Sequence, residues 1–534
     1  MTGMAAKIRA GAAAAVAALL STLVFLSVHP DRFTARTGVV PLAVALWAAF
    51  AAGVLLVRRL PVRWAAALIL LGAVGVQLAA LSAPPQTSDD LYRYIWDGRV
   101  QAAGIDPYAY SPAAPQLVSL RDSFLWPHHA TSWCVPAGTQ LYGSPHGLAV
   151  AGCTLINRPI VHTIYPPVAE AYFFAVHLVT PAGSGTTPIQ AAGACCAVAL
   201  TILLLAGLGR VGVDRRLAVL WAWCPTVALE AGNNAHVDVL AALLTAGALL
   251  VLARPGPVRR SLAGGTLLAL AIWTKVTPVL VVPAVARRRW WALASAGLFA
   301  TVAVYLPHAL AVGSRVIGFL PGYLQQEGYK NGTRFLLLGV LVHGQLGLLA
   351  AFAVLAVTGL LVLWRTDPDR PWRGAVVMTG VALAVTTPPF PWYTMLLVML
   401  VAFDGRAEWL SFAMVKYVAV GDPLPGLNVP VAAIERAGYA AAAAVVVVVS
   451  LIRWLRARGP AEPVSAAEPV SAAEPVSAAA PVSAAAPVPA AAPVPAAEPI
   501  PAAAPVPAAQ PVPAPATLAG QSLFSKPIPV RPVP

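Results

Sequence analysis

Two adjacent carboxylates, Asp89 and Asp90, open a polar segment that directly follows a long apolar run. Ser88 can cap a helix and Gly104 can end one, so the pattern predicts a helix between them, with both aspartates in its first turn. A carboxylate within hydrogen-bond reach of a hydroxyl can take its proton as a general base. The structural alternative is that the two acids only favour the positive end of the helix dipole.

Two cations are candidates for binding a phosphate. Arg93 lies four residues after Asp89 and three after Asp90, so on a helix it can reach either carboxylate. It would hold a base ionised or contact the phosphate, unless it forms only a structural surface pair. Lys275 lies inside an apolar stretch, where a charge costs about 2.5–3.5 kcal/mol. Its ammonium can bind a phosphate as a point charge. The competing explanation for a lysine at this position is that its side chain snorkels to the membrane interface.

The composition identifies the solvent in which these residues must be held. Of 534 residues, 59% are apolar and 10% are charged, and the mean hydropathy is +0.74. Soluble globular proteins carry about 25% charged residues, so this chain has too few to cover the surfaces of several soluble domains. The sequence therefore predicts an all-α polytopic membrane protein with the lipid bilayer as its main solvent.

The basic residues are distributed as in membrane proteins rather than in nucleic-acid-binding proteins. Lys and Arg number 35 against 21 Asp and Glu, which gives a net charge of +14. The arginines gather in short clusters between apolar runs, which is typical of cytoplasmic loops. No stripe of basic and aromatic residues forms a groove, so we expect no nucleic-acid partner. The clusters are Arg58, Arg59 and Arg63; Arg254, Arg259 and Arg260; Arg287, Arg288 and Arg289; Arg365, Arg370 and Arg373; and Arg453, Arg456 and Arg458.

The apolar stretches are long enough for about 11–13 transmembrane helices. The first three spans are expected at 10–28, 39–57 and 64–83, with 10–28 an uncleaved first span. With the N-terminus inside, the long loop 84–161 then opens on the outer face of the plasma membrane. Keeping every arginine cluster inside requires 165–209 and 261–286 each to return the chain to the cytoplasmic side. Pro278 and Pro283 permit a broken pair of half-helices in 261–286. In 165–209 we find no comparable feature that would return the chain.

The chain changes character near residue 459, so we expect a transmembrane domain over 1–458 and a separate tail over 459–534. Hexapeptides such as EPVSAA and APVPAA repeat from Glu462 to Pro515. Proline at this frequency prevents helices and central strands, so the tail is expected to be extended and disordered. The preceding arginines place it in the cytoplasm. It is either a spacer or a docking segment for a proline-recognising partner.

The stretch Asp89–Tyr108, DDLYRYIWDGRVQAAGIDPY, and the later Ile164–Pro167, IYPP, resemble the membrane glycosyltransferases of the GT-C class. Within that class the chain is similar to actinobacterial polyprenyl-phosphate-mannose-dependent mannosyltransferases and to glycosyltransferase family 87. The resemblance implies a multi-span fold whose large first outer loop carries an acidic catalytic motif. It also implies sugar transfer from a polyprenyl phosphate, usually with inversion, and assigns Asp89 or Asp90 to the family's catalytic pair of acidic residues. The acidic pair follows a third span here, where many class members have it after the first.

The resemblance assigns roles to further polar residues. In the turn Asn233–Asp238, His236 would contact phosphate or sugar and Asp238 would orient it, and the alternative is an Asn-capped turn between helices. The segment holding Glu327 and Asn331 would help to bind donor or acceptor, with Glu327 as a reserve base, unless it is an ordinary loop. Tyr165 of the IYPP motif is a further substrate-binding candidate. The segment 388–393 is expected to be an interfacial anchor.

The five cysteines divide between the apolar runs and the outer loop. Cys195, Cys196 and Cys224 are expected to be buried hydrophobic side chains. Cys134 and Cys153 lie in the outer loop, where oxidation is permitted, and we predict a disulfide between them, worth about 3 kcal/mol. No spacing of Cys and His suggests a zinc site.

Together these observations predict a hexosyltransferase at the outer face of the plasma membrane. Its donor would be a polyprenyl-phosphate hexose, with mannose as the sugar that the resemblance implies, and its acceptor a glycan, lipid or protein. Asp89, the preferred base, would deprotonate the acceptor hydroxyl. The sequence identifies no certain cofactor, and a divalent cation between an aspartate and the donor phosphate stays open. The rival functions are a transporter or lipid flippase, disfavoured by the lack of an internal repeat, and a non-catalytic scaffold.

Overall fold

The computed structural model describes residues 3–29, 39–127, 140–142, 152–420 and 429–457. The chain divides into two units, residues 1–460 and 461–534, and only the first contains described residues. The expected tail, 459–534, therefore lies outside the described residues.

The described part of the first unit is built almost entirely of helices, as predicted. Its first half contains α1 (Gly3–Ser27), α3 (Val39–Val57), α4 (Val62–Ala80), α5 (Asp90–Ala102), β1 (Gln140–Tyr142), β2 (Gly152–Thr154), α6 (Pro167–Leu178), α7 (Thr187–Gly207), α8 (Val219–Ala222), α9 (Pro225–Val227) and α10 (Asp238–Leu252). Its second half contains α11 (Val258–Ile272), α12 (Val282–Val285), α13 (Trp290–Val312), α14 (Leu320–Gln326), α15 (Gly344–Arg365), α16 (Trp372–Thr386), α17 (Met395–Asp404), α18 (Ser411–Val420) and α19 (Val431–Ala457). Short 3-10 helices and one π-helix join several of these elements.

Seven helices of the described residues are long and apolar enough to cross a membrane, which makes this a multi-pass membrane protein. The number rises to eight when a bent pair, Pro225–Asn233 with Asp238–Leu252, is taken as one span. The expected number of about 11–13 transmembrane helices is larger than this, because several of the apolar stretches form helices too short for the length criterion. Two of these, Trp372–Thr386 and Pro391–Asp404, are apolar but shorter than a usual span.

The stretches 165–209 and 261–286, each expected to return the chain to the cytoplasmic side, fold in different ways. In 165–209, α6 is only 12 residues long and packs on α5, so α7 alone crosses the bundle. In 261–286, α11 ends at Ile272 and the chain continues through a 3-10 helix, Thr277–Val281, and the short α12. A proline is the second residue of each of these short pieces, and the stretch is broken rather than one continuous helix, as predicted.

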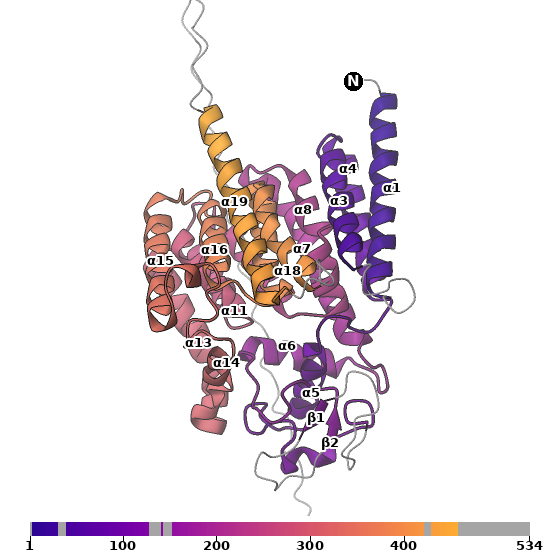
Figure 1. The fold of residues 1–534 in the computed structure, drawn as a ribbon. Helices are drawn as coiled ribbons and strands as arrows, with labels where there is room; N and C mark the ends of the chain where they lie inside the picture. The colour runs from indigo at the N-terminus through magenta and orange to yellow at the C-terminus, as the bar shows by residue number, and fades with distance from the viewer. Residues whose placement is uncertain (1–2, 30–38, 128–139, 143–151, 421–428, 458–534) are drawn as a thin grey trace, which may run out of the picture. The chain divides into compact units, whose positions relative to one another are not determined.

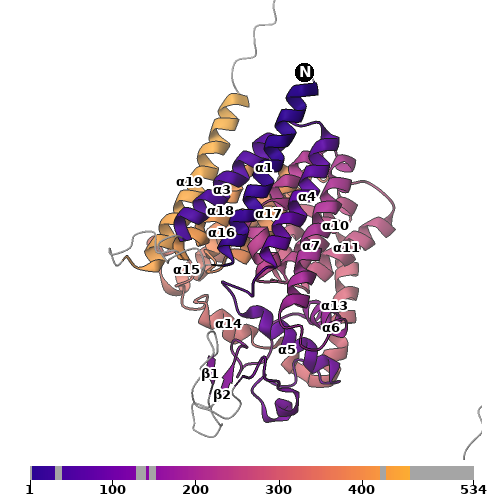
Figure 2. The ribbon, with the colours of Figure 1, turned by 90° about the vertical axis from the view of Figure 1, so that its right-hand side faces the viewer.

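Arginines from distant loops meet at one end of the helix bundle, which we call the arginine-rich end. The Arg216 guanidinium donates hydrogen bonds to the carbonyl oxygens of Arg58 and Leu60. Similar contacts join Arg289 to Gly256, Arg287 to Trp364, Arg288 to Asp369, Arg406 to Arg373 and Arg453 to Glu408. The first residues of α1 and the last residues of α19 lie at this end in both ribbon views (Figures 1 and 2).

The segment between α4 and α7 folds at the opposite end, which we call the α5 end (Figure 1). Here α5 and α6 pack so closely that a Cβ on Gly98 would overlap the carbonyl oxygen of Phe173. The strands β1 and β2 pair antiparallel, with Leu141 opposite Cys153. Cys153 is disulfide-bonded. Cys134 lies outside the described residues, so the pairing of these two cysteines stays a prediction.

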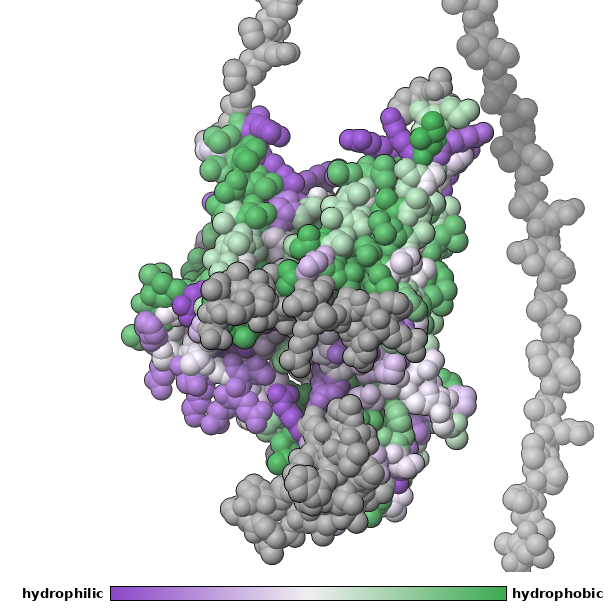
Figure 3. Space-filling model, turned by 45° about the vertical axis from the view of Figure 1, so that its right-hand side comes forward, coloured by the Kyte–Doolittle hydropathy of each residue, from purple (hydrophilic) through white to green (hydrophobic). Residues whose placement is uncertain are grey.

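The surface agrees with a bundle held in lipid and capped by a polar segment. Figure 3 shows hydrophobic side chains over the upper part of the visible face, and hydrophilic side chains gather below them towards the α5 end. The core lies in the middle of the bundle, where α17 is buried from Met395 to Phe403 and Trp221 and Trp223 of the α8 region are buried beside it.

Candidate active site

An irregular backbone presents the polar turn between α9 and α10. Residues Ala228–Asn233 form a π-helix, and Ala235 adopts a left-handed conformation with φ of 54° before α10 begins at Asp238. Such wide turns and left-handed non-glycine residues are uncommon and cluster at functional sites. Helix α7 supports the turn, because a Cβ on Gly193 would overlap the carbonyl oxygen of Ala231.

The two asparagines of this turn tie it to the segment that leads into α5. The Asn233 amide donates to the carbonyl oxygens of Ala80, Ala83 and Pro84. The Asn234 amide donates to Thr87 Oγ1 at 2.7 Å, and the backbone NH of Thr87 donates to Asn234 Oδ1 at 3.3 Å. Because Thr87 is two residues from Asp89, these bonds bring His236 to the start of α5.

Asp90 is the carboxylate that faces this turn. Tyr165 Oη donates a hydrogen bond to Asp90 Oδ2 at 3.1 Å, and His236 Nδ1 lies 3.7 Å from the same oxygen. The Asn157 amide nitrogen lies 2.5 Å from Asp90 Oδ1 and 3.0 Å from Asp89 Oδ1, so it donates to both aspartates. Asp90 remains 18% exposed, which leaves it room for a substrate hydroxyl.

Burial and the charge of Asp90 raise the pKa of Tyr165 well above its ordinary value. Tyr165 therefore stays a neutral hydroxyl that donates to Asp90. Its ring packs edge-on against Tyr94, and the Tyr108 hydroxyl donates to its backbone carbonyl oxygen at 2.7 Å. Both contacts come from the recognised stretch Asp89–Tyr108, so that stretch holds Tyr165 in place.

His236 lies between two carboxylates. Its Nδ1 faces Asp90, and its Nε2 lies 3.5 Å from Oε2 of Glu230. The imidazole is fully buried, and neither ring nitrogen makes a hydrogen bond within the described structure. One face of the ring stacks on the indole of Trp392. A movement of a few tenths of an ångström would give both nitrogens a partner, since such bonds form below about 3.2 Å.

Glu230 was not recognised from the sequence. Tyr417 Oη donates to its Oε1 at 2.7 Å and the Asn234 amide donates to its Oε2 at 3.0 Å, and its side chain is fully buried. A signal was present, because Glu230 is an ionisable residue at the end of an apolar stretch, and such residues are functional candidates by default. Asn157, in contrast, carries no pattern that distinguishes it from other loop residues.

Lys275 also reaches the site. Its ammonium lies 3.2 Å from Oδ2 of Asp238 and is 5.5 Å and 5.7 Å from the ring centroids of Tyr165 and Tyr393. The side chain is 16% exposed, so it does not extend freely to the interface as snorkelling would require. An ammonium has three donors, and those not used by Asp238 are available to an anion.

Arg93, expected beside the acidic pair, instead forms its ion pair with Asp97. Its Nε lies 2.9 Å from both carboxylate oxygens of Asp97, and its Nη1 donates to the carbonyl oxygen of Val161. Both side chains are almost fully buried, at 5% and 3% exposure. These contacts fasten α5 to the loop before α6, and they leave little of Arg93 for a substrate.

A second buried carboxyl lies beside this pair. Thr163 Oγ1 donates to Glu170 Oε1 at 2.7 Å, and the Gln101 amide donates to Glu170 Oε2 at 3.1 Å. Burial and the negative charge of Asp97 raise the pKa of Glu170 well above its ordinary value. Burial also raises the pKa of Asp97, against the lowering effect of Arg93. Both shifts favour the protonated carboxyl over the carboxylate, more strongly for Glu170.

Glu327 and Asn331 are engaged by residues other than Asp90. Glu327 is paired with Arg334 at 3.2 Å and with Arg158 at 3.7 Å, so its carboxylate is already engaged by two guanidinium groups. Asn331 accepts hydrogen bonds from the backbone NH and the hydroxyl of Thr333 within its own loop. Arg158 follows Asn157 and is 42% exposed, which makes it a further cation near the aspartates.

The segment 388–393 is more than an interfacial anchor. Trp392 is only 6% exposed and stacks between His236 and Phe390. The Tyr393 hydroxyl makes a hydrogen bond with that of Tyr323. This segment therefore forms one wall of the site. Because Trp392 is buried, it is not the interfacial anchor that was expected.

The arrangement combines a partly exposed carboxylate, a buried imidazole with a second carboxylate behind it, and a lysine beside two tyrosines. It can accept a proton at Asp90 and hold an anion at Lys275. Among the described residues, no group of three or more His, Cys, Asp or Glu side chains is placed to bind a metal ion. A cation held jointly by one aspartate and a substrate phosphate needs fewer protein ligands, so that alternative stays untested.

The central part of the chain matches a known family model. Residues 163–389 match glycosyltransferase family 87, and the range includes Tyr165, Glu230, His236 and Lys275 but not Asp89 or Asp90. No curated protein and no solved structure matches the chain. The match confirms the resemblance to glycosyltransferase family 87 and indicates a glycosyltransferase.

Proposed function

We propose that this chain, similar to glycosyltransferase family 87 over residues 163–389, transfers a hexose from a polyprenyl-phosphate donor to an acceptor hydroxyl. The observation that carries the proposal is the contact set of Asp90: a partly exposed carboxylate fixed by Tyr165 and Asn157, beside a buried imidazole. Asp90 replaces Asp89 as the preferred base. Asp89 directly precedes α5 at the N-cap position, whereas Asp90 is the one that contacts Tyr165 and His236.

In the proposed reaction, Asp90 takes the proton of the acceptor hydroxyl. The hydroxyl oxygen attacks the anomeric carbon, and the bond from that carbon to the phosphate oxygen breaks. The electron pair leaves with the polyprenyl phosphate. A single displacement of this kind inverts the anomeric centre, and mannose is the expected sugar.

Lys275 is proposed to hold the leaving phosphate. Its ammonium lies over two tyrosine rings and has donors left to bind the phosphate. When no phosphate is bound, Asp238 balances its positive charge. A cation placed where negative charge develops lowers the barrier of group transfer. Arg158, which follows Asn157, could support the same phosphate.

His236 and Glu230 are proposed to act behind Asp90. Once Asp90 is protonated, a hydrogen bond to His236 would help to disperse the proton, and Glu230 would fix the imidazole orientation. This arrangement resembles other carboxylate–imidazole pairs, where a buried acid selects the tautomer of the ring. Trp392 would keep the imidazole plane constant during transfer.

The sidedness of the bundle supports transfer at the outer face of the plasma membrane. Arginine clusters concentrate in cytoplasmic loops, and here they meet at the end opposite Asp90. This supports an outer position for the α5 end, where the lipid-borne donor would meet its acceptor glycan, lipid or protein. The tail after α19 would then be cytoplasmic.

The test is transfer of labelled mannose from polyprenyl-phosphate-mannose by membranes that contain equal amounts of each variant. Asp90→Asn should lower the rate by at least about 100-fold, the usual contribution of a general base. Asp89→Asn should lower it less, and Asp369→Asn, at the arginine-rich end, should not change it. Full rates in both site variants would refute the mechanism. Activity of the wild type with another lipid-linked sugar alone would refute only the donor, and net lipid movement without transfer would favour a flippase.

A further inference from the structure

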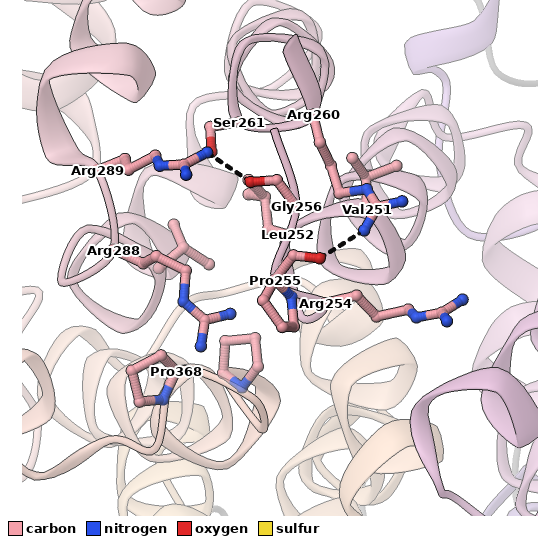
Figure 4. Close-up of a pocket in the computed structure, with 12 residues that line it drawn as sticks. Val251, Leu252, Arg254, Pro255, Gly256, Arg260, Ser261, Arg288, Arg289 and Pro368 are labelled. Carbon is pink, nitrogen blue, oxygen red and sulfur yellow. Dashed lines mark hydrogen bonds between the residues drawn. The ribbon is translucent and has the colours of Figure 1, made fainter. Parts of the chain in front are cut away.

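A second polar site lies at the arginine-rich end, far from Asp90. A cavity of about 220 Å³ lies between three loops, those that join α10 to α11, α12 to α13, and α15 to α16. Its lining includes Pro255, Arg288, Arg289, Pro368 and Pro371. Figure 4 shows the Arg288 guanidinium pointing into the space between Pro255 and Pro368, whereas Arg254 extends away from them.

The guanidinium groups that line this cavity have N–H donors that their protein contacts do not use. Arg288 Nη2 lies 2.9 Å from Oδ1 of Asp369, but its Nη1 is buried and has no hydrogen-bond partner in the described structure. Arg289 donates from Nη1 to the carbonyl oxygen of Gly256 at 2.6 Å, and Arg260 donates to that of Pro255 at 2.7 Å. Each guanidinium has five donors, and a buried donor without an acceptor is costly. An anion in the cavity would satisfy them.

The neighbouring residues indicate where the anion comes from. Trp290 and Trp291 follow Arg289 directly and are 68% and 48% exposed, and Trp364, whose carbonyl oxygen accepts from Arg287, is 69% exposed. Exposed tryptophans concentrate at the headgroup level of a bilayer. The cavity therefore opens at the depth of lipid headgroups, and basic pockets between helices on the cytoplasmic side bind anionic lipids.

We propose that this cavity binds the phosphate of an anionic phospholipid headgroup, with Arg288 and Arg289 as its main donors. The planar guanidinium fits a phosphate by paired hydrogen bonds, and the acyl chains would lie along the exposed apolar face of α13. The site is independent of the transferase reaction, so its test does not depend on that proposal.

The test uses the full-length protein in nanodiscs of phosphatidylcholine with or without phosphatidylglycerol, and counts retained lipids by native mass spectrometry. We expect phosphatidylglycerol to be retained by the wild type and bound about tenfold more weakly by Arg288→Gln, as for the loss of one charge-assisted hydrogen bond. Arg63→Gln, which removes an exposed arginine outside the cavity, should bind as the wild type does. Equal losses in Arg63→Gln and Arg288→Gln would refute a specific site.

A further variant separates binding from structure. Asp369→Asn breaks the same ion pair as Arg288→Gln but leaves the guanidinium, so it should retain phosphatidylglycerol at least as well as the wild type. If Asp369→Asn loses the lipid as Arg288→Gln does, Arg288 has only a structural role and the proposal fails. If inorganic phosphate in phosphatidylcholine nanodiscs stabilises the protein to the same extent, with the same dependence on Arg288, the lipid assignment is wrong.

Discussion

The imidazole of His236 lies almost flat on the indole of Trp392, with ring centroids 3.8 Å apart and planes inclined by 25°. The two residues are 156 positions apart in the sequence, and each comes from a break between helices. The contact fixes the plane of a ring whose two nitrogens face Asp90 and Glu230. The orientation of the imidazole therefore depends on the α16–α17 connection, which carries Trp392, as well as on the α9–α10 turn, which carries His236.

This stacking can be tested by changing the indole. Trp392→Phe keeps an aromatic face and should retain most transfer activity, whereas Trp392→Leu should lose about tenfold because the imidazole is no longer held flat. The measurement is the transfer rate at equal protein abundance. Trp364→Leu, which removes an exposed tryptophan at the other end, is the matched control. A normal rate in Trp392→Leu would contradict this role.

Glu230 should contribute to transfer without touching the substrate. Glu230→Gln keeps the size of the side chain but removes the negative charge that faces His236, so we expect a rate roughly 10- to 100-fold lower. Its pH–rate profile should also change, which a purely structural contact would not produce. Glu408→Gln, at the arginine-rich end, serves as the control. An unchanged rate and profile in Glu230→Gln would remove this residue from the mechanism.

The pairing of Lys275 with Asp238 separates stability from catalysis. Lys275→Met leaves a buried carboxylate without its cation, which costs about 3–5 kcal/mol, and should lower the amount of folded protein. Adding Asp238→Asn removes the unpaired charge and should restore abundance. If Lys275 holds the donor phosphate, the double variant remains inactive. Recovery of transfer along with abundance would instead show that the lysine only balances Asp238.

The buried Asp97–Glu170 pair should make stability depend on pH. Because burial and Asp97 raise the pKa of Glu170 in the folded state, the folded form holds a proton that the unfolded form releases. Stability from this group is therefore greatest at low pH and is lost as the pH rises through the folded-state pKa. Glu170→Gln cannot lose a proton, so its unfolding temperature should fall less than that of the wild type between pH 5 and pH 8. Parallel curves for the two proteins would contradict the prediction.

Gly193 tests the support of the polar turn from behind. An added Cβ would overlap the carbonyl oxygen of Ala231, so Gly193→Ala should displace the π-helix, destabilise the protein by about 1–3 kcal/mol and lower transfer. Gly247→Ala on α10 is a matched control, since its Cβ would make only an ordinary 3.7 Å contact with Leu267. Equal behaviour of the two variants would show that the turn adapts without effect.

The fold class followed from composition, since a chain with so few charged residues cannot cover a soluble surface. The number of spans did not, because hydropathy identifies the apolar stretches before and after the turn Asn233–Asp238 but not how sharply the chain bends between them. The bend between Pro225–Asn233 and Asp238–Leu252 is 119°, and it depends on hydrogen bonds from Asn233 to residues about 150 positions earlier. Such long-range bonds leave no local pattern.

Some of the site residues could be recognised from the sequence, and others could not. His236, Asp238 and Lys275 interrupt apolar runs, where a polar group requires an explanation, and Asp90 opens the polar segment after one. The structure brings all four together with Tyr165. Arg93 had the correct helical spacing to reach Asp89 or Asp90, but Asp97, four residues later on the same face, offered it a better-buried partner. Asn157 could not be identified, because its importance comes only from where its loop returns to α5.

The asparagine bonds between the α9–α10 turn and the exit of α4 also limit how the protein can be dissected. Residues 84–166 expressed alone would keep both aspartates, Asn157 and Tyr165, yet would lack the imidazole, Glu230 and the lysine, which all arrive on later membrane helices. Such a soluble fragment should be inert, and co-expressed halves split within residues 208–218 should regain activity only when the halves assemble in the same bilayer.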